Sequence, residues 1–162
     1  LSESEFAELL VRWYQYAVFS PVLRMHGYRG DIEQGVLYKP NEIWSYGEET
    51  YAVLKKYLDI RVALKPYLSE IYKQASEAGL PLLRMMFMEF PEDEKCWEYK
   101  EQYMFGWKYL VAPVLYAGMK ERKVYLPKGK WKDFHSGECY DGGQEITVKT
   151  PIDIIPVFEK CI

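Results

Sequence analysis

Apolar residues recur at helical intervals from the start of the chain and stop before Pro21. Ser2 followed by Glu5 has the spacing of a capping box, in which each residue satisfies a free backbone N–H group at the start of a helix. The apolar positions that follow share one helical face: Phe6, Leu9, Leu10, Trp13 and Ala17. The pattern therefore predicts a helix that begins near Ser2 and ends near Ser20.

A short apolar segment and a long irregular one come next. Val22–His26 is mostly apolar and lies between Pro21 and Gly27, which is typical of a buried strand, although a short piece of helix would give the same pattern. Residues 28–47 contain glycines and a proline without a steady period, so we expect a long loop. Loops of this length inside a compact domain are usually functional or mobile.

Helical spacing returns between Glu48 and Ala78. The repeating apolar face consists of Tyr51, Leu54, Leu58, Val62, Tyr67, Leu68, Ile71 and Ala75. Pro66 lacks a backbone donor and clashes with the preceding turn, which predicts either two helices or one kinked helix. Gly79 followed by Pro81 predicts the end of this helical region.

After Pro81 the chain changes to short β-type runs separated by turn signals. The runs are Leu82–Phe87, Tyr109–Leu115, Lys123–Leu126, Trp131–Phe134, Glu145–Lys149 and Ile152–Phe158. Residues 91–106 interrupt them as a loop with one helical turn. Strands at this spacing predict an antiparallel sandwich, with a domain boundary near Gly79 that divides the chain into 1–79 and 80–162.

The first half lacks the elements that a parallel strand needs around it. A helix, a strand, a long loop and two helices cannot cover both faces of a parallel sheet. Residues 1–79 are therefore expected to be a slice of a larger α/β domain. The chain does not begin with Met, which fits a fragment or a processed product.

Charge and composition exclude two classes of partner. The 21 basic and 24 acidic residues give a net charge of −3, and the basic residues are scattered, so nucleic-acid binding is not expected. No apolar run approaches the roughly 18 residues of a membrane span. The acidic start, Leu1–Glu5, lacks the basic-then-apolar order of a signal peptide.

The cysteine and aromatic contents narrow the chemistry further. Cys96, Cys139 and Cys161 are far apart and lack zinc-ligand spacing, so we expect reduced thiols, a cytoplasmic location and no metal or cofactor. The 15 Tyr and 5 Trp residues are unusual for a chain of 162. Aromatic side chains supply buried area in cores, and they also form the stacking walls of sugar sites.

Several motifs occur in a fixed order along the chain. They are Arg12–Gln15, Phe19–Pro21, Arg24–Gly27, Glu42–Glu48, Arg61–Tyr67, Arg84–Pro91, Gln102–Gly106, Leu110–Val114 and Tyr125–Trp131. Together they resemble the glycoside hydrolase family 31 signatures, including the segments written RWxQ, RxHG, EIWxFGE and YLPxGxW. Each motif alone is weak, but the whole set in register spans nearly the entire chain.

The resemblance implies a retaining α-glycosidase that hydrolyses α-linked glucosides or xylosides. The implied fold is an α+β composite, in which the C-terminal slice of a (β/α)8 barrel, mostly helical, is followed by a small antiparallel β-sandwich. Val22–His26 would be the eighth barrel strand. The implied partners are an α-linked oligosaccharide or glycoside and either the remainder of the catalytic barrel or another copy of the chain.

The resemblance also implies a role for one residue. His26 would lie at the C-terminal end of the eighth strand, where barrel active sites are built, and the matching family histidine hydrogen-bonds sugar hydroxyls. Arg12 and Arg24 are expected to pair with barrel carboxylates. Trp44 and Tyr46 could line the entrance to the site or simply pack. The aromatic residues of the second half are expected in the core or at the domain interface: Trp97, Trp107, Tyr109, Trp131 and Phe134.

The chain lacks the two carboxyl groups that retaining glycoside hydrolysis requires. The family's nucleophile and acid/base aspartates lie on strands that precede the first residue, so this chain alone is expected to be inactive. Asp31 and Glu33 are interpreted as solvated loop acids, and the same holds for Glu48–Glu49 and Glu92–Glu94. No nucleophile elbow accompanies His135, which argues against a Ser-His-Asp site.

Three interpretations stay open at this point. The chain could be an inactive fragment of an α-glycosidase, or a subunit that completes an active site with a separate polypeptide. It could also be a carbohydrate-binding or structural module whose aromatic surface binds a glycan. The sugar itself is not determined, because the residues that distinguish glucose from xylose lie largely upstream.

Overall fold

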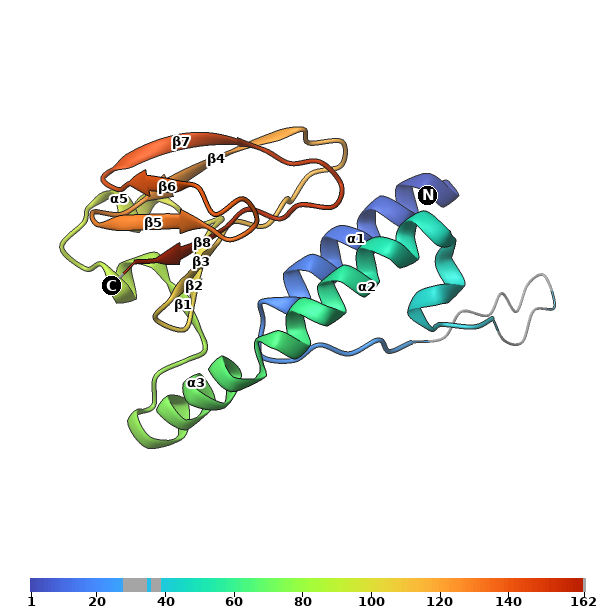
Figure 1. The fold of residues 1–162 in the computed structure, drawn as a ribbon, viewed down its shortest axis with the longest axis horizontal. Coiled ribbons are helices and arrows are strands. Elements are labelled where there is room, and N and C mark those ends of the chain that lie inside the picture. Colours follow the sequence, from blue (N-terminus) through green and yellow to red (C-terminus); the bar gives the residue numbers. More distant parts are fainter. Residues whose placement is uncertain (28–34, 36–38, 162) are drawn as a thin grey trace.

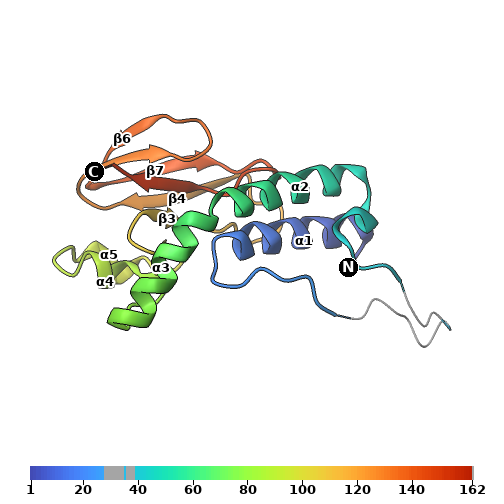
Figure 2. The same cartoon turned by 60° about the horizontal axis from the view of Figure 1, so that its bottom comes forward.

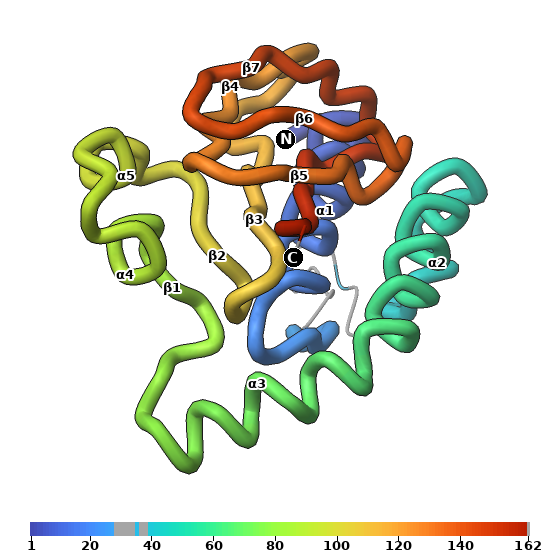
Figure 3. The backbone as a smooth tube through the Cα atoms, turned by 60° about the vertical axis from the view of Figure 1, so that its left-hand side comes forward, coloured from blue at the N-terminus to red at the C-terminus, as the bar shows by residue number. Residues whose placement is uncertain are grey.

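The protein forms three layers in the computed structural model, which describes residues 1–27, 35 and 39–161. Helices α1 to α3 lie on one side of a six-stranded sheet, and a two-stranded sheet lies on the other (Figure 1). Figure 2 shows α1 and α2 lying side by side along their length. In Figure 3 the chain passes from α2 through α3 to strand β1, at the edge of the large sheet.

Helix α1 spans Glu3–Val18 and begins with the expected capping box. The Ser2 hydroxyl accepts from the Glu5 amide at 3.3 Å, and the Glu5 carboxylate accepts from the Ser2 amide at 2.7 Å. The buried residues of α1 are Val11, Tyr14, Gln15 and Val18. The predicted apolar face stays largely open, because Leu9 is 47% and Trp13 68% exposed. Helix α1 therefore has one face that is buried, with Val11, Tyr14 and Val18, and a second apolar face, with Leu9 and Trp13, that is largely open.

The second helical region is broken where the proline predicts it. The 3₁₀ helix η1 spans Ile43–Tyr46, helix α2 spans Glu48–Ala63 and helix α3 spans Lys65–Ala78. Pro66 lies in the first turn of α3, where its missing N–H group leaves no hydrogen bond unmade. Gly79 ends α3 in the left-handed conformation, with φ of 68°, as expected for a C-terminal cap.

The second half pairs its strands antiparallel throughout, as expected. The strands are β1 Leu83–Met85, β2 Tyr103–Phe105, β3 Tyr109–Val111, β4 Glu121–Leu126, β5 Lys130–Asp133, β6 Cys139–Asp141, β7 Gln144–Lys149 and β8 Val157–Lys160. The large sheet has the order β1-β2-β3-β8-β5-β6, and β4 pairs with β7 in the small one.

Several boundaries in the second half differ from the prediction. The run Leu82–Phe87 splits into β1 and the single-turn helix α4, Met86–Glu89. Residues 91–106 contain the expected helical turn, α5 Lys95–Glu98, but also strand β2. The run Ile152–Phe158 forms a strand only from Val157, because the preceding residues turn back to the helices.

The expected strand Val22–His26 is not assigned as a strand. The described part of the chain gives it no ladder partner, and a strand is defined by pairing with a neighbour. Its residues run beneath α1 and α2 without helical structure (Figure 1). The prediction was therefore wrong for this chain by itself, for the physical reason that no neighbouring strand is present among the described residues.

Two cores share the large sheet. Phe105, Tyr109 and Val157 face the helices and pack with Val18, Leu54, Tyr57 and Ile71 in the first core. Their neighbours Met104, Leu110 and Phe158 face the opposite side and pack with β4 and Trp131 in the second. Side chains alternate between faces along a strand, so both faces of the large sheet are covered. Both halves of the chain therefore contribute to the first core, whereas the second core is built from residues of the second half.

None of the helices in the described ranges is long and apolar enough to cross a membrane.

Candidate functional site

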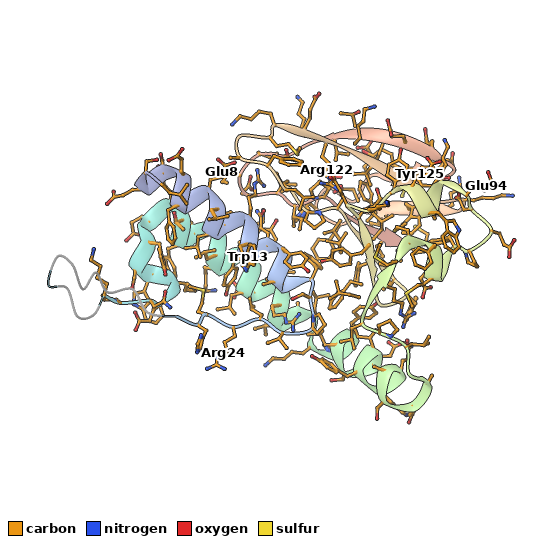
Figure 4. The ribbon with its side chains drawn as sticks, turned by 180° about the vertical axis from the view of Figure 1, so that it is seen from behind. Glu8, Trp13, Arg24, Glu94, Arg122 and Tyr125 are labelled. Atoms are coloured by element: carbon orange, nitrogen blue, oxygen red, sulfur yellow. The ribbon has the colours of Figure 1, made fainter. Side chains whose placement is uncertain are left out.

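The segment 22–27 presents alternate side chains to two environments. Leu23 and Met25 are half-buried and pack against the helical core, whereas Val22, Arg24 and His26 are exposed. This alternation is that of a strand with one covered and one open face. In a closed barrel the covered side chains of a strand face the outer helices and the others face the interior. Arg24 is labelled on the open side in Figure 4.

The start of this segment is fixed by side chains of α2 and α3. Arg61 donates to the carbonyl oxygens of Val18, Ser20 and Pro21, each at 2.7 Å. The Tyr72 hydroxyl donates to the Pro21 oxygen at 2.8 Å. A planar guanidinium can donate in several fixed directions at once, so Arg61 sets where the chain leaves α1.

The far end of the segment lies beside η1. The Asn41 side chain donates to the Gly27 carbonyl oxygen at 3.3 Å, and the Tyr46 hydroxyl donates to the Asn41 side-chain oxygen. The Tyr46 ring stacks on Phe6 of α1 with a centroid distance of 6.0 Å. Tyr46 therefore packs against α1, whereas Trp44 is 66% exposed beside it.

Arg12 binds the main chain of the second half, so the expected pairing with a carboxylate is corrected. It donates to the carbonyl oxygens of Thr150 and Ile154 at 2.8 Å and of Pro151 at 3.1 Å. Gln15 donates to the Ile152 oxygen at 2.8 Å. Burial lowers the pKa of the Arg12 guanidinium from its ordinary value, but it stays charged because that value is very high.

Helix α2 completes this contact, which we call the clasp. The Tyr57 hydroxyl donates to the main-chain carbonyl oxygen of Asp153 at 3.0 Å and accepts from the Ile155 amide at 3.1 Å. Lys56 donates to the same Asp153 oxygen at 2.9 Å and pairs with its carboxylate at 3.0 Å. The clasp, formed by Arg12, Gln15, Lys56 and Tyr57 with residues 150–155, joins the helices to the strand layer.

No candidate acid reaches a catalytic arrangement in the part of the chain that the structure describes. Asp31 and Glu33 lie outside the described residues. Glu48 and Glu49 are exposed in the first turn of α2. Asp93 accepts from the Tyr125 hydroxyl at 2.7 Å, which gives it a structural role.

Among the residues that the structure describes, neither a metal site nor a histidine-based site is assembled. Within the described ranges, no group of three His, Cys, Asp or Glu side chains could hold a metal ion. His135 lies in the turn after β5, with Nε2 2.9 Å from the Ile155 carbonyl oxygen, and burial lowers its pKa. His26 is exposed on the segment 22–27.

The aromatic residues of the second half divide between burial and exposure. Trp131 is fully buried, and Tyr109 is 7% exposed. Trp107 and Phe134 are half-buried against the first core. Trp97 differs from the expectation, because it is 56% exposed.

The roles of Arg61, Tyr72 and Tyr57 were not predicted. Arg61 was noted only as the start of a motif. The partners of these three residues are main-chain oxygens and amides far along the chain, which leave no mark in the sequence near any of them. The sequence signal that could have identified these residues is a charged or polar side chain on a helical face that is otherwise apolar.

Family models match both halves of the chain. The glycosyl hydrolases family 31 TIM-barrel domain matches residues 2–71, and the glycosyl hydrolase family 31 C-terminal domain matches residues 79–161. The chain belongs to glycosyl hydrolase family 31.

Individual relatives agree over nearly the whole chain. An α-xylosidase of Saccharolobus solfataricus is 36% identical over 96% of this chain, and α-glucosidase 2 of Bacillus thermoamyloliquefaciens is 33% identical over 94%. A solved family 31 α-xylosidase from a soil metagenome, in complex with xylose, is 42% identical with a TM-score of 0.89 over 96% of this chain. The chain spans 20% and 19% of the two curated relatives and 25% of that solved chain.

Proposed function

We propose that this chain is the C-terminal part of a retaining α-glycosidase that hydrolyses α-linked glucosides or xylosides. Residues 1–79 are the end of its (β/α)8 barrel, and residues 80–162 are its C-terminal β-sandwich domain. The family membership supports this assignment, and the printed names of two relatives, α-xylosidase and α-glucosidase, support the substrate class.

The observation that carries the proposal is the open side of the segment 22–27. Val22, Arg24 and His26 share that side, while Leu23 and Met25 pack against the helices. A barrel strand presents its sides in this way, and barrel active sites lie at the C-terminal ends of the strands. His26, the last of the three, is therefore the side chain that contacts a sugar hydroxyl, and Arg24 lies one layer deeper.

The rest of the barrel is the partner that this chain requires. Two carboxyl groups flank the bond in a retaining glycosidase, and the chain alone is inactive because it supplies neither. The remaining strands cover the open side of the segment 22–27 and the exposed face of α1. Those strands come from the same polypeptide; a separate subunit would give the same site and is distinguished by the length of the parent protein.

A cytoplasmic location is part of the proposal and rests on the thiols. Cys96, Cys139 and Cys161 are all free, and burial raises the pKa of the Cys96 thiol to about 12. A buried thiol with a raised pKa is unreactive, so Cys96 acts as a small core residue.

His26→Ala in the intact enzyme tests the function. We expect kcat/KM for aryl α-glucosides or α-xylosides to fall by at least about tenfold, because a hydrogen bond to a sugar hydroxyl contributes roughly 1.5–3 kcal/mol when the partner is left unpaired. The melting temperature should hardly change, since the proposed hydrogen bond of His26 at the active-site end of the strand is made to the substrate and not to the protein. The control is His135→Gln, which alters the other histidine of the chain. Unchanged turnover with early unfolding would assign His26 to structure instead.

A further inference from the structure

Trp97 presents one face of its indole to solvent from a fixed position. Its other face stacks on Phe87, with ring centroids 4.4 Å apart and an interplanar angle of 14°. The indole N–H group donates to the Pro91 carbonyl oxygen at 3.2 Å. The ring is held from its face and its edge, yet it remains 56% exposed. A flat aromatic surface that is already ordered loses little entropy when a ligand stacks on it.

The support beneath Trp97 is equally well anchored. Asp93 accepts from the Lys95 amide at 3.2 Å with one carboxylate oxygen and from the Tyr125 hydroxyl at 2.7 Å with the other. Cys96, the neighbour of Trp97 on α5, is 2% exposed within the second core. Figure 4 shows Tyr125 close to Glu94, on the loop that leads into α5. The ring is therefore fixed to the strand layer.

This site lies far from the segment that carries His26. Helix α5 lies near one end of the long axis of the molecule, and the segment 22–27 runs below α1 and α2 from the middle towards the other end (Figure 1). Figure 4 shows the same separation between Glu94 and Arg24. A ligand at Trp97 would therefore occupy a different place from the bond that is cleaved.

The surroundings of the ring select the class of ligand. Glu92, Glu94 and Glu98 are exposed around α5 and outnumber the exposed Lys95 and Lys100, so an anionic ligand is disfavoured and hydroxyl donors find acceptors. Beside the indole, the large exposed apolar side chains on β1 and α4 are Met85, which is 39% exposed, and Met88, which is 44% exposed. A standard protein interface buries about 800 Å² on each partner, far more than one ring and two methionines provide. The polarised C–H groups of a sugar ring suit the negative face of an indole.

We propose that Trp97 and Phe87 form a surface site that binds a chain of α-linked glucose units, apart from the site of hydrolysis. The choice of an α-linked glucan rests on the function proposed above, because a glucan bound at one end of the molecule stays near the enzyme that cuts it. Stacking on Trp97 supplies the affinity, and the carboxylates around α5 accept hydrogen bonds from the sugar hydroxyls. The geometry of the ring pair does not depend on the missing barrel strands.

Native gel electrophoresis of the 162-residue chain in gels that contain dextran or soluble starch tests the site. We expect one of the two glucans to retard the chain and a β-linked glucan to leave it unaffected. Trp97→Ala should weaken retention by about fivefold or more, and Trp97→Tyr should keep most of it. The matched control is Trp13→Ala, which removes a ring that is 68% exposed on α1. Retention is taken relative to the mobility of each variant in a gel without glucan, so that a change in self-association is not counted as a change in binding.

Three results would overturn the site. They are a chain that neither glucan retards, equal retention of Trp97→Ala and the unaltered chain, and an equal loss in Trp13→Ala. If Trp97→Ala does not fold, the unaltered chain is titrated with maltotriose and isomaltotriose while the NMR signals of the indole N–H groups are followed. A shift of the Trp97 signal with a stationary Trp13 signal supports the site, and a stationary Trp97 signal overturns it.

The outcome is separable from that of the proposed function. Retention that depends on Trp97, in a protein whose intact form hydrolyses no α-glycoside, would keep the surface site and reject the enzyme. Hydrolysis of α-glycosides by the intact enzyme, without retention that depends on Trp97, would support the proposed function and reject the surface site. A lower melting temperature of intact Trp97→Ala with unchanged retention would show that another part of the protein covers the ring, which also rejects the site.

Discussion

Arg12 connects α1 to main-chain oxygens that lie about as far along the sequence as this chain allows. Its guanidinium reaches the carbonyl oxygens of Thr150, Pro151 and Ile154 and also the Gln15 side chain at 3.2 Å. Hydrogen bonds from a charged donor are stronger than neutral ones, and carbonyl oxygens deprived of a donor lose more than the bond itself. The RWxQ motif therefore has a structural explanation in which Arg12 and Gln15 act together.

Arg12→Ala should lower the free energy of unfolding by about 2–3 kcal/mol, because several carbonyl oxygens lose a charged donor. This corresponds to a fall in melting temperature of roughly 4–12 °C for a chain of this size. The control is Arg24→Ala, which removes an exposed arginine and should change stability by about 0.5 kcal/mol or less. Equal effects of the two substitutions would contradict the clasp.

His135 gives the chain a pH-dependent stability with a defined sign. Burial is the largest cause of its lowered pKa, and Lys56 acts in the same direction, whereas Asp133, Asp153 and the Ile155 oxygen favour the charged ring. Below the ordinary histidine pKa of about 6.5 the unfolded chain binds a proton that the folded chain resists. Stability should therefore be greatest above that pH and fall as the pH drops towards the lowered folded value. Melting curves across this window should show a shallower decline for His135→Gln than for the unaltered chain; parallel declines would exclude His135 as the cause.

Among the secondary-structure elements, the turn between β2 and β3 depends on a glycine. Gly106 has φ of 61°, and its amide donates to the Leu82 oxygen at 2.7 Å. A Cβ atom there would lie 2.2 Å from the Tyr67 hydroxyl and 2.6 Å from a methyl group of Ile71. Tyr67 could not yield easily, because its hydroxyl donates to the Phe105 oxygen at 2.7 Å. Helix α3 and the turn therefore approach each other too closely for any side chain.

Gly106→Ala should destabilise the chain by about 3 kcal/mol or more, through overlap with Tyr67 in addition to the strain of a left-handed residue. Gly79→Ala is the matched control, because its φ is 68° but nothing lies within 4 Å of the added atom. That substitution should cost only about 1–2 kcal/mol. Chemical unfolding of both variants measures the difference, and indistinguishable midpoints would mean that the turn relaxes away from α3.

Elements with local signals were predictable from the sequence, and elements defined by their partners were not. The capping box at Ser2 and the break at Pro66 involve only neighbouring residues. Strands β2 and β6 are three residues long, and only their pairing makes them strands. The amphipathic pattern of α1 identified its open face, whereas the buried face includes Gln15, which no hydrophobic period includes.

The candidate site was predictable only in part, for the same reason. His26 was named through the family motif and its place after an apolar run, and its role stays a prediction. The partners of Arg12 were not foreseen because main-chain oxygens carry no sequence signal. Trp97 was expected to be buried, since composition alone cannot tell a stacking surface from a core.

At the scale of the whole molecule, the outer face of α1 forms an apolar groove with residues 113–117. Leu9, Trp13 and Tyr16 line it from the helix, opposite Leu115 and Tyr116. Figure 4 shows Trp13 on the side of the molecule where this face is open. Clustered exposed apolar side chains promote association. The isolated chain should therefore form dimers or larger species whose mass rises with concentration.

Trp13→Glu should shift that equilibrium towards the monomer, because a carboxylate in the groove would have to be desolvated on contact. Solution mass across a dilution series measures the shift. Trp97→Glu is the matched control, since it adds the same charge at a comparably exposed ring elsewhere. An unaltered chain that stays monomeric at every concentration would show that the groove does not drive self-association.

The clasp also affects how freely domains could be recombined among family members. Apart from the Asp153 carboxylate, its acceptors on residues 150–155 are main-chain oxygens, which every amino acid carries in the same place. A C-terminal half transplanted from a relative would therefore still offer Arg12 and Tyr57 their partners, provided that the loop keeps its path. The buried side chains of the first core would have to be exchanged together, since Val18, Leu54 and Ile71 share that core with Phe105, Tyr109 and Val157. In a chimera joined at Gly79, the main-chain hydrogen bonds of the clasp would align the two halves, and the side chains of the first core would decide how well the halves pack.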